Sequence, residues 1–79
     1  MITPGATSAL ESSEVFNALR RHSSGDWGDV DEHDHKENEL SVSHNMRIFS
    51  VYHTSIGQKF WIITEADRSY TTVLLPEEY

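Results

Sequence analysis

The spacing of the apolar residues changes near Asn45, and this change constrains the fold more than any other feature of the sequence. Before it, apolar residues recur at helical spacing, as in the stretch from Val15 to Leu19. After it, from Met46 to His53, they alternate between two sides, as in a strand with one buried face. The sequence therefore predicts helices followed by a β-sheet.

The first helix of substantial length is expected from about Ser13 to His22. Ser8 to Glu11 matches a capping box ahead of it, and Ser12 or Ser13 offers a second N-cap. Gly25 suits a left-handed stop after the last turn. Further upstream, Thr3-Pro4 suits the cap and first turn of a short helix, and fraying of residues 1–6 is the alternative.

A second helix is expected from about Glu32 to Ser43. Asp31 is placed to cap it, with Asp34 in the reciprocal third position. No apolar residue occurs between Val30 and Leu40, so a broad apolar face cannot hold this helix. We expect it to be anchored by four flanking apolar residues, Trp27, Val30, Leu40 and Val42.

The second half of the chain predicts three strands, near Met46–His53, Lys59–Thr64 and Tyr70–Leu75. The connections between them are short and polar, so the strands are expected to form an antiparallel meander. The predicted fold class is α+β, with N-terminal helices packed on a three-stranded sheet. Residues 1–79 form one small domain, with a helical part at 7–44 and a sheet part at 45–79.

The 79 residues include no cysteine, which excludes disulfides, thiolate metal sites and thiol nucleophiles. No apolar stretch reaches the length of a membrane span, and the first residues lack the basic and apolar parts of a secretory signal. We therefore expect a cytoplasmic protein without a membrane partner, as a monomer or a weak homodimer.

Acidic residues are concentrated in one short window of the chain. The 14 residues from Asp26 to Glu39 hold seven acids against one base, Lys36, for a formal charge of −6 of the −7 of the whole chain. A field of that strength favours cationic partners and disfavours direct contact with nucleic acid or anionic membranes. The candidate partner-binding residues are these seven acids: Asp26, Asp29, Asp31, Glu32, Asp34, Glu37 and Glu39.

Neither a metal centre nor a catalytic site is predicted. His33 and His35 lie two residues apart, whereas helical metal pairs are spaced by four, and a third ligand such as His44 or His53 has no signal in the sequence. No nucleophile elbow or glycine-rich phosphate loop is present. Glu65 to Arg68 is expected to be an exposed loop whose aspartate bonds its own backbone. We expect no cofactor and no enzymatic activity.

From Asp26 onward, the chain resembles a family of small acidic proteins found on bacterial plasmids and other mobile elements. The residues that carry the resemblance are Gly25-Asp26-Trp27-Gly28-Asp29, the Asp31–Glu39 helix start with Asn38, and the ending Phe60–Ser69 and Thr71–Tyr79. The resemblance covers about two thirds of the chain and brings no catalytic motif. It implies a place among small acidic inhibitors of host restriction and CRISPR systems.

We therefore expect an anti-CRISPR or anti-restriction protein that mimics DNA and binds the basic nucleic-acid-binding surface of a defence complex. Carboxylates three or four residues apart on a helix lie about 5 to 6 Å from one another and present a row to lysines and arginines. Asp31, Asp34 and Glu37 are expected to form such a row, flanked by Glu32 and Glu39. The alternative is a regulatory or antitoxin-like interaction module that uses a sheet edge or an exposed aromatic, with a merely solvated acidic helix.

Overall fold

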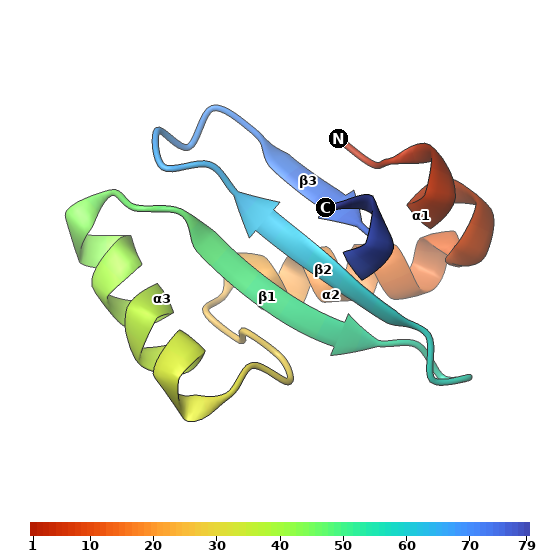
Figure 1. Cartoon of the computed structure of the whole chain (residues 1–79), viewed down its shortest axis with the longest axis horizontal. Coiled ribbons are helices and arrows are strands. Elements are labelled where there is room, and N and C mark those ends of the chain that lie inside the picture. The colour runs from red at the N-terminus through yellow and green to blue at the C-terminus, as the bar shows by residue number, and fades with distance from the viewer.

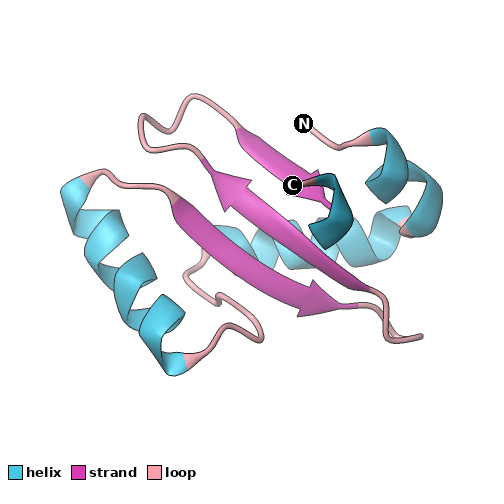
Figure 2. Cartoon of the chain, in the orientation of Figure 1, coloured by secondary structure: helices cyan, strands magenta, loops and turns pink.

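The computed structural model describes residues 1–79 as three α-helices and a three-stranded antiparallel sheet in the order β1-β2-β3 (Figure 1). The predicted α+β fold is confirmed, and the strand ends fall within two residues of those predicted. The helices flank the sheet rather than alternating with its strands (Figure 2). The elements are α1 (Pro4–Ala9), α2 (Ser12–Ser23), α3 (Glu32–His44), β1 (Ile48–His53), β2 (Lys59–Thr64), β3 (Thr71–Leu74) and a short 3-10 helix, η1 (Pro76–Glu78).

Helix α2 crosses one face of the sheet and closes the main core there (Figure 1). Its Val15 and Ala18 face inward and join one cluster with Phe60 and Ile62 of β2. Ile62 is opposite Ser50 of β1 in the antiparallel register, so these two side chains point to the same face of the sheet. The core is therefore built by one sheet face and the inward side of α2, and Ala6 of α1 and Leu10 complete it.

The other face of the sheet is covered mainly by aromatic contacts from the C-terminal end. Trp61 of β2 lies edge-on between Phe49 of β1 and Tyr79, with ring centroids 5.0 and 5.7 Å away. Arg47 lies above the Tyr79 ring and donates a hydrogen bond of 2.7 Å to its hydroxyl. The chain end thus folds back over this face of the sheet.

Helix α3 lies beside the edge of the sheet at β1, and its anchors differ from those predicted. Leu40 and Val42 are each 53% exposed, so the prediction that they hold the helix is wrong. The buried residues of α3 are Asn38 and Ser41. The Asn38 side chain donates to the Phe49 carbonyl (2.6 Å) and accepts from the Phe49 N–H (3.0 Å), so an amide replaces the missing apolar face.

Arg68 caps the C-terminal end of α3. The Arg68 guanidinium donates to the carbonyls of Ser41 (2.8 Å) and Met46 (2.6 Å), two acceptors near the helix C-terminus. Asn45 ends the helix in the left-handed conformation, with φ of 53°. The loop from Glu65 to Arg68, expected to be only an exposed connection, thereby fixes α3. Its predicted aspartate turn is confirmed, because Asp67 accepts from the Ser69 N–H at 3.0 Å.

Both edges of the sheet are occupied by the chain's own backbone. At β1, Val51 exchanges backbone hydrogen bonds with Trp27 (3.1 Å) and Asp29 (2.7 Å). At β3, Val73 is bonded to Met1 (2.8 Å) and Thr3 (3.0 Å), so residues 1–3 run beside the sheet in place of the frayed segment that the sequence allowed. Covered edges leave little opportunity for a partner to add a strand.

The helix caps are partly as predicted. The Thr3 hydroxyl accepts from the Ala6 N–H, and Gly25 is left-handed with φ of 88°. The capping box at Ser8 to Glu11 is wrong: Ser8 lies inside α1, and Glu11 precedes α2 without a side-chain cap. Leu10, which links the two helices, is buried in the core.

Candidate functional site

The acidic window lies at the β1 edge of the molecule. It comprises the turn that follows α2 and the first two turns of α3 (Figure 1). The structure brings all seven predicted acids to this edge, but they are in different environments. Three groups can be distinguished by what each carboxylate contacts.

The two acids of the turn are bonded to cationic or protonatable side chains. Asp26 accepts from the Arg21 guanidinium at 2.7 and 3.2 Å and from the Gly28 N–H at 3.1 Å. These hydrogen bonds, led by the one from Arg21, hold the pKa of Asp26 below its usual range. Asp29 lies 2.7 Å from His53 Nδ1 on β1. Both carboxylates therefore hold the turn against α2 and the sheet.

Two further acids, Asp31 and Asp34, belong to the N-terminal end of α3. Asp31 is confirmed as the N-cap, because its Oδ1 accepts from the Asp34 N–H at 2.8 Å. Asp34 itself is only partly exposed. Of the row expected on Asp31, Asp34 and Glu37, only Glu37 is both exposed and outside the cap.

Three glutamates of α3, Glu32, Glu37 and Glu39, project into solvent with side chains 86%, 52% and 58% exposed. Each has one partner four residues away on an adjacent helical turn: Lys36 at 3.9 Å, His33 at 3.7 Å and His35 at 3.7 Å, respectively. No hydrogen bond or ion pair joins any of the three glutamate side chains to another element of the fold.

The positions of His33 and His35 explain why they do not converge. Each reaches its own glutamate four residues further along α3, on a different side of the helix. No group of three histidine, aspartate or glutamate side chains in the structure is arranged to hold a metal ion.

A buried polar cluster lies outside this surface and was missed by the sequence reasoning. His22 of α2 contacts Ser50 and Thr64, and burial lowers its pKa to about 4. The signal was available, because Val15, Ala18 and His22 share one helical face. Ser50 is fully buried, so this serine is not open to a substrate.

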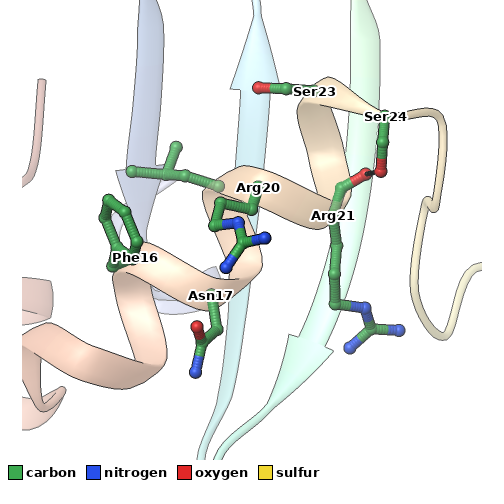
Figure 3. Close-up of a pocket in the computed structure, with 7 residues that line it drawn as sticks. Phe16, Asn17, Arg20, Arg21, Ser23 and Ser24 are labelled. Carbon is green, nitrogen blue, oxygen red and sulfur yellow. Dashed lines mark hydrogen bonds between the residues drawn. The ribbon is translucent and has the colours of Figure 1, made fainter.

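A hollow of about 710 Å³ lies on the outer side of α2, and it is basic rather than acidic. Asn17, Arg20 and Arg21 extend from α2 in a similar direction in Figure 3, while Phe16 points away from them. Arg21 forms an ion pair with Asp26, whereas Arg20 makes no ion pair. No acidic residue and no histidine is among the residues that line this hollow.

Comparisons with protein-family models, curated proteins and solved structures found no match. None of the helices is both long enough and apolar enough to span a membrane. The candidate site is therefore defined by its own geometry and charge.

Proposed function

We propose that this protein is a non-enzymatic acidic inhibitor from a mobile genetic element. It mimics DNA and binds the basic nucleic-acid-binding surface of a bacterial defence complex, as an anti-CRISPR or anti-restriction protein does. The observation that carries the proposal is the exposure of Glu32, Glu37 and Glu39 on consecutive turns of α3, where they have no contact that holds the fold.

The spacing of these glutamates suits a partner that normally binds phosphates. Glu32 and Glu39 are seven residues apart, which corresponds to about 10 Å along a helix axis. Glu37, two residues before Glu39, projects from a different side of the same turns. Lysines and arginines in a DNA-binding groove gain affinity by neutralising such a series of charges and releasing bound ions. The carboxylates of Asp26 and Asp29 add to the negative potential of this edge, and their hydrogen bonds hold them in place.

A second function, a protein-interaction module, is favoured by one separate observation. Leu40 and Val42 on α3 and Phe16 on α2 are more than half exposed. Exposed apolar side chains of this size are common at protein interfaces when they form a patch. In that case the acidic helix contributes solubility, and binding depends on apolar contacts.

A pair of charge-matched variants separates these two functions. Glu37→Lys/Glu39→Lys removes two exposed acids of α3, and Glu11→Lys/Glu77→Lys makes the same change in net charge elsewhere. We expect the first pair to weaken binding to the DNA-handling subunit of a restriction or CRISPR complex by about tenfold or more at low salt. The second pair should bind nearly as the parent does.

Circular dichroism of both variants controls for folding. Equal binding by the two folded variants would exclude a specific role for the α3 acids. Loss of binding in Phe16→Ser or Val42→Ser, with the acidic variants unaffected, would instead support the interaction module.

A further inference from the structure

His22 joins the C-terminal turn of α2 to the sheet. It is 7% exposed, and its Nδ1 lies 2.6 Å from Ser50 Oγ on β1. Its Nε2 lies 2.7 Å from Thr64 Oγ1 on β2, which lies 2.8 Å from Thr71 Oγ1 on β3. One imidazole therefore connects the helix to a hydroxyl network that reaches all three strands.

The surroundings of His22 favour its neutral form. Its polar contacts on the strands are hydroxyls, and no carboxylate forms an ion pair with it. The nearest charged neighbour on α2, Arg21, is paired with Asp26, and the nearby titratable group on β1, Tyr52, donates to the Asp26 carbonyl. An imidazolium would be buried without a counter-ion, and both of its ring nitrogens would have to donate.

The two halves of α2 are held by different contacts. Val15 and Ala18 lie in the apolar core, which does not depend on His22. The C-terminal turn borders a hollow of about 410 Å³, lined by His22 and Trp27 on one side and by Val42 of α3 on another. Trp27 packs edge-on against His22 at 5.8 Å, and its buried indole N–H has no hydrogen-bond partner. Hollows border both halves of the helix, and the C-terminal turn differs in that its buried contact with the strands is the polar one made by His22.

We propose that His22 is a pH-sensitive latch: its protonation releases the C-terminal turn of α2 together with Trp27, while the first half of α2 stays on the sheet. Because the open form binds the proton more readily than the closed form, opening increases as the pH falls from about 6.5 towards 4. At neutral pH the latch is closed. The latch does not depend on the acidic surface of α3.

Hydrogen exchange in the whole chain tests the latch directly. After correction for intrinsic rates, protection of the Arg21 to Ser23 amides and of the Trp27 indole N–H should fall by about tenfold between roughly pH 7 and pH 5. The Ile62 amide in the core should keep its protection. The control His44→Gln, at an exposed histidine of α3, should behave as the parent does.

Two further measurements make the outcome decisive. His22→Gln should remove the pH dependence at the Arg21 to Ser23 amides. Should this variant not fold, the ring signal of His22 in the parent gives the answer by NMR, because its titration must coincide with the loss of protection. Protection that is independent of pH, or a simultaneous loss at Ile62, would overturn the latch.

Discussion

Asn38 shows how a single polar residue replaces an apolar face. Its side chain satisfies both backbone groups of Phe49 at the edge of β1, next to the backbone pairing at Val51, and the residue is only 3% exposed. A buried amide with both partners in place adds stability, whereas losing it leaves a buried N–H and C=O without partners. The attachment of α3 therefore depends on this one residue more than on its apolar neighbours.

Replacing Asn38 with leucine should lower the free energy of unfolding by about 2 to 3 kcal/mol, because the two Phe49 groups lose their partners. Urea denaturation measures the difference. Glu39→Gln, the exposed neighbour, should change stability by less than about 0.5 kcal/mol and serves as the control. A leucine variant as stable as the parent would show that α3 is held by other contacts.

The buried His22 also makes stability depend on pH. Its pKa in the folded chain is lowered to about 4 from 6.5, so its contribution is complete above about pH 6.5 and is lost as the pH falls towards 4. Allowing for partial screening by solvent, the loss should be on the order of 2 kcal/mol. Comparing unfolding of the parent and His22→Gln at several pH values isolates this contribution from that of the exposed histidines.

At the scale of elements, the two ends of the chain hold each other through η1 and α1. The Glu78 carboxylate accepts from the Gly5 N–H (2.9 Å), the Leu75 N–H (2.9 Å) and the Thr3 hydroxyl. These bonds, led by the one from Thr3, lower the pKa of Glu78. Glu78 is therefore a structural residue, unlike its neighbour Glu77.

Glu78→Ala should lower the thermal midpoint and expose the amides of α1 to hydrogen exchange, because the helix loses an acceptor at its first turn. Glu77→Ala should leave both unchanged. The stabilising effect of Glu78 should be present above its unfolded pKa and disappear as the pH falls through its lower folded pKa. Equal behaviour of the two variants would show that α1 is held without this cap.

At the scale of the whole molecule, most local signals in the sequence were good guides, and the capping box at Ser8 to Glu11 was the exception. The Asp31 cap, the left-handed Gly25 and the ends of β2 all follow from residues within a few positions of one another. The anchors of α3 did not follow, because Asn38 and Arg68 act on backbone groups 11 and 27 residues away. The type of a side chain alone does not show which distant backbone group it will bind.

The candidate site was likewise only partly predictable. Composition located the acidic window, and helical spacing predicted a row on Asp31, Asp34 and Glu37, of which only Glu37 is both exposed and outside the cap. The division between bonded and free acids required the tertiary structure, because Asp29 meets His53 across 24 residues. In that division, the free acids are the three glutamates of α3.

The most direct test of the central claim is competition with duplex DNA for one basic protein surface. The DNA-handling subunit of a restriction or CRISPR complex is saturated with a labelled duplex, and this chain is added at two salt concentrations. The account predicts that the duplex is displaced, that both ligands never bind together, and that the chain's affinity falls steeply as salt rises. A ternary complex, or binding that is insensitive to salt, would contradict the claim that the carboxylates of α3 stand in for phosphates.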